Sequence, residues 1–256
     1  MARIFITGSS DGLGQMAAKL LIASGHQVVL HARNELRAAH AIAQVPEAEA
    51  VFTADLSSIA ETKSLAERVN EYGRFDSIIH NAAVGYQERE RIGTVDGLPQ
   101  VFAVNSLAPY ILTALINRPK RLVYLSSGLH LSGDNSLADL AWEKRRWSGG
   151  QAYCDSKLHV ALLAFNVAKR WPEVMSNCVE PGWVATKMGG PAATDDLAQG
   201  PLTQVWLASD PSLSSEPTGG YYYHQKPGKV AKEAYEPALQ QRFLDACAEY
   251  SGVILV

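Results

Sequence analysis

The sequence has few cysteines, no long apolar run and no strong charge of either sign. Its three cysteines, Cys154, Cys178 and Cys247, lack the spacing of metal ligands, which suits a reducing cytoplasm better than a disulfide framework. No apolar stretch reaches the roughly 18 to 20 residues of a membrane-spanning helix, and the N-terminus lacks a signal-peptide layout. A formal net charge of −3 gives no sign of a nucleic-acid partner. We therefore expect a cytoplasmic protein with no membrane span, no nucleic acid and no bound metal.

Short apolar runs alternate with helical patterns along most of the chain. The patterns predict strands over residues 3–7, 27–31, 50–53, 75–80, 121–126, 174–179 and 220–224. They predict helices over residues 13–24, 35–44, 57–72, 101–116, 151–170, 202–208 and 234–250. Nearly continuous apolar strands that alternate with helices are typical of a parallel sheet covered on both faces. No linker or repeat divides the chain, so we predict one α/β domain over residues 1–256.

Two long irregular segments interrupt this pattern, at residues 128–150 and 181–200. Both follow the carboxyl ends of predicted strands, where open α/β sheets bind ligands. Loops of this length in a compact domain are usually functional or disordered. We therefore predict that both segments are substrate loops.

A glycine-rich turn joins the first predicted strand to the first predicted helix, with the sequence Thr7-Gly8-Ser9-Ser10-Asp11-Gly12-Leu13-Gly14. Glycines there permit a tight turn and let the backbone approach a pyrophosphate, while the helix N-terminus offers N–H groups and a partial positive charge. A structural glycine turn is the alternative. Because the motif follows an N-terminal strand and opens a helix, it indicates a dinucleotide site in a single-domain, Rossmann-type, doubly wound parallel sheet with helices on both faces.

A tyrosine and a lysine lie four residues apart on a predicted helix, so Tyr153 and Lys157 project from one face. Tyrosine has a pKa of about 10, and a nearby lysine charge lowers it, which would let Tyr153 exchange protons with an alcohol or alkoxide. Ser127, at the end of the preceding strand, can polarise a carbonyl; Ser126 is the neighbouring alternative, on the opposite face. We read His31 and His80 as structural.

Together these motifs resemble the short-chain dehydrogenase/reductase family, whose order they follow over most of the chain. The resemblance implies that Asn105, Ser127, Tyr153 and Lys157 form the catalytic group, with Asn105 holding a water that links Lys157 to solvent. The alternative for Asn105 is a satisfied buried polar side chain. The resemblance also implies contacts to adenine from Asp55 and Leu56, to the nicotinamide carboxamide from residues 181–186, and a segment at residues 81–83 in which Ala83 replaces the usual glycine. The predicted cofactor-binding residues are Gly8, Ser10, Asp11, Gly12, Leu13, Gly14, Arg33, Asp55, Leu56, Asn81, Ala82, Ala83, Tyr153, Lys157, Pro181, Gly182, Val184 and Thr186.

Cofactor choice depends on the end of the second predicted strand, which approaches the adenosine ribose. An acidic residue there binds the 2′-hydroxyl of NAD(H), whereas an arginine accepts the 2′-phosphate of NADP(H). In this chain Ala32 stands where the acidic residue would be, and Arg33 follows it, which favours NADP(H). Asp11 opposes this choice, because a carboxylate near the phosphate would repel it. NAD(H) therefore stays open as the second cofactor.

The long stretch between Ser127 and Tyr153, with Trp142 and Trp147, resembles the retinol-dehydrogenase-like branch of the family. The branch acts on apolar aldehydes, ketones and alcohols, and the apolar and aromatic residues of the two long loops favour such a substrate. We expect an NADP(H)-dependent enzyme that transfers a hydride between nicotinamide and a carbonyl or alcohol, assembled as a homodimer or homotetramer. Two alternatives are a dinucleotide-sensing regulator without turnover, which would usually lack the Tyr and Lys pair, and a sugar-nucleotide epimerase or dehydratase, which usually has a longer C-terminal part.

Overall fold

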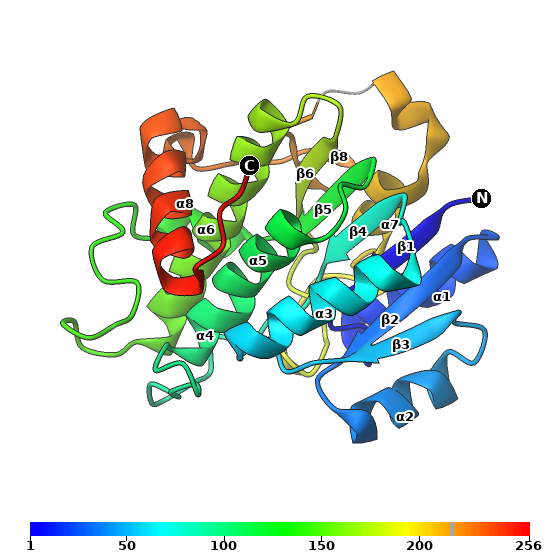
Figure 1. Ribbon diagram of the computed structural model, residues 1–256, viewed down its shortest axis with the longest axis horizontal. Helices are drawn as coiled ribbons and strands as arrows, with labels where there is room; N and C mark the ends of the chain where they lie inside the picture. The colour runs from blue at the N-terminus through cyan, green and yellow to red at the C-terminus, as the bar shows by residue number, and fades with distance from the viewer. Residues whose placement is uncertain (216–217) are drawn as a thin grey trace.

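A computed structural model, which describes residues 1–215 and 218–256, shows one sheet with helices on both faces (Figure 1). The strands pair in the order β3-β2-β1-β4-β5-β6-β7-β8. All neighbours are parallel except β7 and β8, which are antiparallel. The strands are β1 (Arg3–Ile6), β2 (Gln27–Ala32), β3 (Ala50–Thr53), β4 (Ser77–His80), β5 (Arg121–Leu125), β6 (Met175–Glu180), β7 (Tyr221–Tyr223) and β8 (Lys226–Pro227). The predicted doubly wound parallel sheet is confirmed; the antiparallel edge strand β8 was not predicted.

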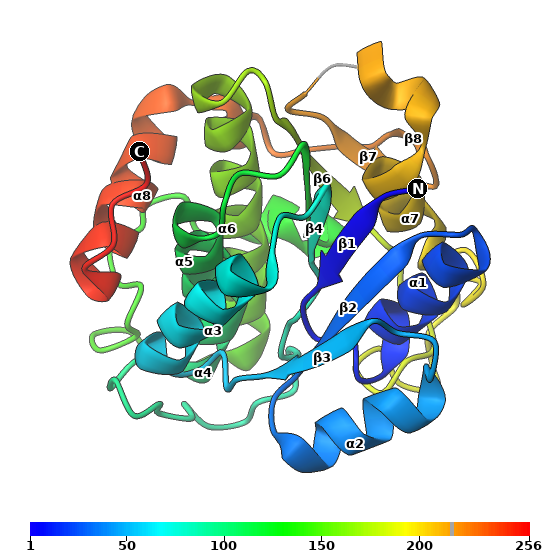
Figure 2. The ribbon, with the colours of Figure 1, turned by 45° about the vertical axis from the view of Figure 1, so that its right-hand side comes forward.

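The helices divide between the two faces of the sheet (Figure 2). They are α1 (Gly12–Ala23), α2 (Glu35–Gln44), α3 (Ile59–Tyr72), α4 (Gln100–Phe102), α5 (Ala108–Leu115), α6 (Gly149–Arg170), α7 (Leu202–Ser209) and α8 (Pro237–Ser251), with short 3-10 turns at Gly128–Ser132, Pro211–Ser215 and Lys232–Tyr235. On one face, α3, α5, α6 and α8 enclose the larger apolar cluster. On the other, α1, α2 and α7 enclose a second cluster. Burial on both faces explains why the strand sequences are almost entirely apolar.

Helix starts follow local side-chain chemistry. The side chain of Asn34 accepts a hydrogen bond from the Arg37 amide at the start of α2, and Ser148 does the same for Gln151 at the start of α6. Such caps satisfy backbone donors that have no partner within the helix. These two starts fall within two residues of the predicted ones, so the boundaries of the helices that carry Arg37 and Tyr153 are determined locally.

The segment predicted as one helix over residues 101–116 contains a break that the apolar pattern does not reveal. A π-helical turn over Ala103–Leu107 separates α4 from α5. Pro109 has no N–H, so it cannot bond to the carbonyl of Asn105, four residues earlier. Instead the Ala108 amide donates to the Ala103 carbonyl, five residues earlier. The turn thus places Asn105 where the regular helical ladder is broken, a location that often marks a functional site.

The carboxyl ends of the strands meet along one edge of the sheet. The strand order reverses between β1 and β4, because β2 follows β1 on one side and β4 lies on the other. In open α/β sheets a crevice forms outside the carboxyl ends at such a point. The glycine turn and the segments after β4, β5 and β6 all begin at this edge. Across residues 1–215 and 218–256, none of the helices combines the length and apolar character that crossing a bilayer requires.

Candidate active site

The glycine turn between β1 and α1 is held close to the sheet. Gly8 and Gly12 have positive φ angles of 63° and 55°, which favour glycine. A Cβ on Gly14 would lie 2.4 Å from Nδ2 of Asn81, so this glycine permits close packing. A Cβ on Gly12 would meet only a methyl group of Thr186, at 4.0 Å. The open backbone at Gly12, at the N-terminus of a helix without a side-chain cap, fits an anionic phosphate group.

Two residues anchor this turn to its neighbours. The Gly8 amide donates to Nδ1 of His31 at 3.0 Å, and Nε2 of the same ring lies 3.0 Å from the Ala54 carbonyl oxygen. Burial lowers the pKa of His31 to about 4, so the ring is neutral and joins the turn to β2 and β3. Asn81 donates from Nδ2 to the carbonyl oxygens of Thr7 and Gly8, at 2.9 and 3.0 Å. His31 thus has the structural role expected of it.

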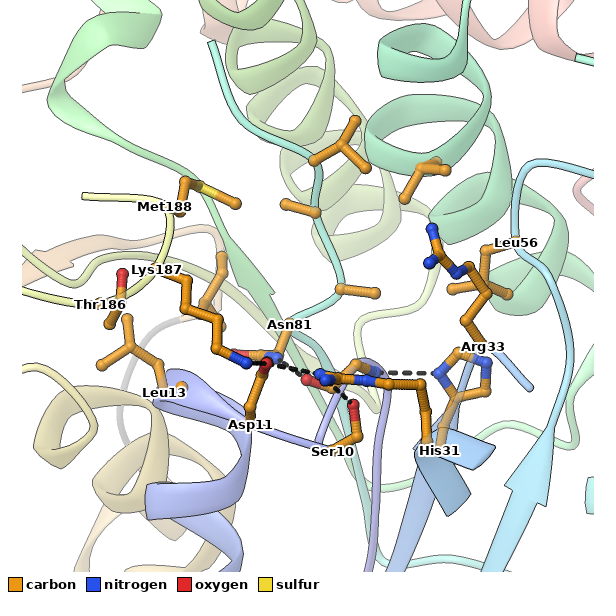
Figure 3. Close-up of a pocket in the computed structure, with 18 of the residues that line it drawn as sticks. Ser10, Asp11, Leu13, His31, Arg33, Leu56, Asn81, Thr186, Lys187 and Met188 are labelled. Carbon is orange, nitrogen blue, oxygen red and sulfur yellow. Dashed lines mark hydrogen bonds and ion pairs between the residues drawn. The ribbon is translucent and has the colours of Figure 1, made fainter. Parts of the chain in front are cut away.

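The charges at the adenosine end of the crevice differ from the sequence-based expectation. Asp11 is paired with two cations, Arg37 at 2.5 Å and Lys187 at 2.9 Å. Figure 3 shows Lys187 reaching toward Asp11. Partial burial raises the pKa of Asp11, but the hydrogen bonds and charges of Lys187 and Arg37 outweigh this and lower it. Arg33 lies on another part of the crevice wall, near Leu56 (Figure 3). The sequence predicts that Asp11 repels a 2′-phosphate; in the structure its carboxylate is offset by two cations that are distant from it in the sequence.

A pocket of about 480 Å³ extends along the strand ends. Of the predicted cofactor-binding residues, all line it except Gly14, Gly182 and Val184. Gly182 and Val184 line an adjoining pocket instead. Sequence reasoning missed Arg37 and Lys187, which also line the first pocket. Arg37 could have been noticed in the sequence, because it lies in the first turn of the helix that follows Arg33.

Tyr153 and Lys157 lie side by side on α6, and both are buried. The Lys157 ammonium is 5.4 Å from the centroid of the Tyr153 ring and donates to the Leu125 carbonyl oxygen at 2.8 Å. Burial lowers the pKa of Lys157 to about 8. Burial also raises the pKa of Tyr153, against a hydrogen bond with Ser127 that lowers it. The expected lowering by Lys157 is therefore absent in the protein alone, because removal of the phenolate from water dominates.

The two serines at the end of β5 have different surroundings. The buried Ser126 hydroxyl donates to the Lys157 backbone carbonyl at 2.9 Å, which ties β5 to α6. Ser127 is less buried; its side chain accepts from the Leu129 amide at 3.3 Å and interacts with Tyr153. Both serines line the second pocket, so the expected opposite faces do not separate them; Ser127 is the better placed for a substrate oxygen because the Ser126 hydroxyl already donates its proton to Lys157.

Asn105, in the π-helical turn, uses its whole side-chain amide within the protein. Its Oδ1 accepts from the Val84 amide at 2.8 Å, and its Nδ2 donates to the Val84 carbonyl at 3.0 Å and to Ser156 Oγ at 3.1 Å. Both N–H donors are thus occupied. This geometry fits the alternative of a satisfied buried polar side chain, and the water-holding role stays a prediction.

The second pocket, also about 480 Å³, adjoins the first and shares Tyr153 with it. Tyr86 stands edge-on to Tyr153, with ring centroids 5.5 Å apart, and Met188 Sδ lies 3.9 Å from the Tyr153 hydroxyl. Trp183 and Leu129 add further apolar surface. The pocket is therefore mainly apolar and reaches the Tyr153 hydroxyl.

The two predicted substrate loops contribute unequally to this pocket. Residues 181–200 supply much of its wall, whereas residues 128–150 supply only Gly128 and Leu129. Trp142 and Trp147 pack against each other, with ring centroids 5.0 Å apart, and Trp142 is 7% exposed. They line neither pocket, so using them as an indication of an apolar substrate was wrong. Arg145, stacked on Trp142, binds the buried Asp155 at 2.6 Å and fixes this loop to α6, the helix that carries Tyr153 and Lys157.

Comparisons of sequence and structure with known proteins agree with these features of the site. The family model described as "short chain dehydrogenase" matches residues 2–123. The short-chain dehydrogenase chyC of Penicillium rubens is 44% identical over 100% of this chain and 99% of its own. The chain belongs to the short-chain dehydrogenase family. Human retinol dehydrogenase 13 is 28% identical over 98% of this chain and 84% of its own, in agreement with the predicted branch. A short-chain dehydrogenase of Shigella flexneri, solved with NADP, is 25% identical and superposes with a TM-score of 0.65, covering 88% of this chain and 97% of its own.

Proposed function

We propose that this oxidoreductase uses NADP(H) to transfer a hydride between nicotinamide and a carbonyl or alcohol group of a largely apolar substrate. One observation carries the proposal: Tyr153 lies in the walls of both pockets. The first pocket is bounded by the glycine turn, and the second is mainly apolar. The Tyr153 phenol at their junction can therefore contact a cofactor bound in the first pocket and a substrate bound in the second.

The residues of the first pocket fit a dinucleotide. The open backbone at Gly12 leaves room for a pyrophosphate. Arg33 offers a guanidinium for a 2′-phosphate, and Arg37 and Lys187 leave the area around Asp11 with a positive balance. The solved NADP complex of the Shigella flexneri relative supports the same choice.

When bound, the nicotinamide supplies or accepts the hydride at carbon. In reduction, Tyr153 donates its proton to the carbonyl oxygen as negative charge develops there, and in oxidation it takes the proton from the alcohol. The Lys157 charge, 5.4 Å from the Tyr153 ring, stabilises the phenolate that remains. The Ser127 hydroxyl, at the pocket wall, donates a hydrogen bond to the reacting oxygen. Because burial raises the pKa of Tyr153, the phenol is protonated at neutral pH and ready to act as the acid.

A panel of apolar ketones and aldehydes, followed by NADPH absorbance, tests the proposal with a matched pair of variants. Tyr153→Phe should reduce kcat by a factor on the order of 10² to 10⁴, because it removes the proton donor. Tyr86→Phe is the control: it removes a hydroxyl from a ring of the same pocket that stands edge-on to Tyr153, and it should change kcat far less. Equal activity of Tyr153→Phe and the wild type would contradict the assigned role. A wild type that binds NADPH but turns over no member of the panel would favour the sensing alternative.

A further inference from the structure

The second pocket contains one carboxylate in an otherwise uncharged wall. Among the described residues that line it, Glu180 is the only one of the Asp, Glu, Lys, Arg and His types. Glu180 ends β6 and is about half-buried. Glu180 takes no part in the hydride and proton transfers proposed here. A carboxylate at the edge of an apolar cavity is costly unless it receives hydrogen bonds, so its presence there calls for a partner.

The fold brings the Glu180 carboxylate next to the backbone that follows Ser127. A Cβ on Gly128 would lie 2.5 Å from Glu180 Oε1, so glycine at this position is what lets the carboxylate approach. Gly128 directly follows Ser127, whose hydroxyl we assign to the substrate oxygen. A substrate whose carbonyl reaches Ser127 and Tyr153 thus has Glu180 beside it in the same pocket.

Few interactions within the protein offset the cost of burying the Glu180 carboxylate. Burial raises the pKa of its carboxyl, a hydrogen bond from the Gly128 backbone lowers it, and the neighbouring carboxylate of Asp195 raises it. His224 is the nearby group that lowers it through charge. No salt bridge to Glu180 occurs within residues 1–215 and 218–256. When Glu180 is ionised, its oxygens can only accept hydrogen bonds; because Glu180 lines the pocket, a donor group on a bound substrate would supply the missing partner.

We propose that Glu180 determines substrate specificity by accepting a hydrogen bond from a hydroxyl or ammonium group on an otherwise apolar carbonyl substrate. The apolar body of the substrate would pack on Leu129, Trp183 and Met188, which line the same pocket. This inference rests on the proposed function and names its substrate class: carbonyl compounds that carry a hydrogen-bond donor.

Matched aryl methyl ketones test the inference. The probes carry a methyl, a hydroxyl or an aminomethyl substituent on the ring, each as the meta and the para isomer, so that the reach to Glu180 varies. Their Kd on the NADPH-loaded protein is measured by cofactor fluorescence, and their kcat/KM by NADPH absorbance. The wild type should prefer at least one donor-bearing probe over its methyl partner by about 10- to 150-fold, the value of about 1.5 to 3 kcal/mol for a hydrogen bond to a charged group.

Variants at Glu180 assign the preference to its carboxylate. Glu180→Leu should abolish the preference and leave the methyl probe bound as well or better. Glu180→Gln is nearly isosteric; its amide oxygen still accepts, so part of a hydroxyl preference should persist while an ammonium preference is lost. Asp195→Asn is the matched control, since it removes a neighbouring carboxylate that lines neither pocket, and it should change the preference by less than about threefold. NADPH affinity and thermal stability show whether each variant is folded.

The readouts separate this inference from the function on which it rests. Equal affinity of the wild type for donor and methyl probes, including no measurable affinity for either, would overturn the inference. So would a preference that survives in both Glu180 variants. A preference in Kd that depends on Glu180, without turnover of any probe, would support the inference and contradict the proposed oxidoreductase function.

Discussion

The cofactor preference can be tested through three charges at the adenosine end of the first pocket. The perturbations are Arg33→Ala, Arg37→Ala and Asp11→Asn, all in residues that line this pocket. NADPH and NADH differ by one 2′-phosphate, so the ratio of their Kd values isolates the interaction of each variant with that group. The wild type should bind NADPH more tightly than NADH.

The expected change in NADPH preference can be estimated for each variant. A charge-assisted contact of Arg33 with the phosphate contributes about 1.5 to 3 kcal/mol, so Arg33→Ala should reduce the NADPH preference about 10- to 150-fold. If the Asp11 carboxylate lies about 7 Å from the phosphate, it repels it by about 0.6 to 1.2 kcal/mol per phosphate charge at an effective dielectric constant of about 40 to 80. Arg37 offsets this charge through its contact at 2.5 Å, so Arg37→Ala should cost at least a similar amount, about 3- to 7-fold. Asp11→Asn removes this repulsion and leaves Arg37 and Lys187 without their anionic partner, so it should widen the NADPH preference by a similar factor.

Titration of both cofactors by fluorescence at low and high salt measures these ratios. Added salt should reduce the NADPH preference, since the charges are partly exposed and screened. Arg74→Ala is the matched control: Arg74 is exposed and precedes the amino end of β4, away from the carboxyl-end crevice. A wild type that prefers NADH, or an unchanged ratio in Arg33→Ala, would refute the assignment of Arg33 to the phosphate.

Three further predictions concern other parts of the site. Burial lowers the pKa of Lys157 to about 8, so the lysine is charged below that pH and loses its charge above it. The kcat/KM for reduction should therefore decline above about pH 8. A pH profile that stays flat to pH 10 would contradict this. Cofactor and substrate should slow amide hydrogen exchange within residues 181–200, because residues of this segment line both pockets. The effect should be much smaller within residues 133–150, which line neither pocket. A larger effect in residues 133–150 would contradict this assignment of the pocket walls. Arg145→Met should lower the free energy of unfolding by about 3 to 5 kcal/mol in chemical denaturation, since it leaves the buried Asp155 carboxylate without its cation; adding Asp155→Asn should recover part of the loss, and a neutral single variant would show that the pair contributes nothing.

The sequence alone predicted the features that local chemistry determines. Apolar runs alternating with helical patterns were enough for the parallel sheet, because each buried strand must hide both of its faces. The glycine turn could be predicted from the sequence, because it requires positive φ angles at Gly8 and Gly12 and a close approach of the backbone at Gly8 and Gly14. The spacing of Tyr153 and Lys157 was likewise sufficient, since residues four apart on a helix share a face.

Only the tertiary structure decided how distant residues change the chemistry of those motifs. Asp11 is neutralised by Lys187, which lies 176 residues away in the sequence, and no local pattern reports that contact. The tryptophans of residues 128–150 are apolar enough for a pocket wall, but packing places them against each other. Glu180 reaches the backbone next to Ser127 because β5 and β6 are neighbours and Gly128 leaves space for its carboxylate. Charge pairing and burial depend on which strand ends and loops meet in space, and the order of residues along one element does not contain that information.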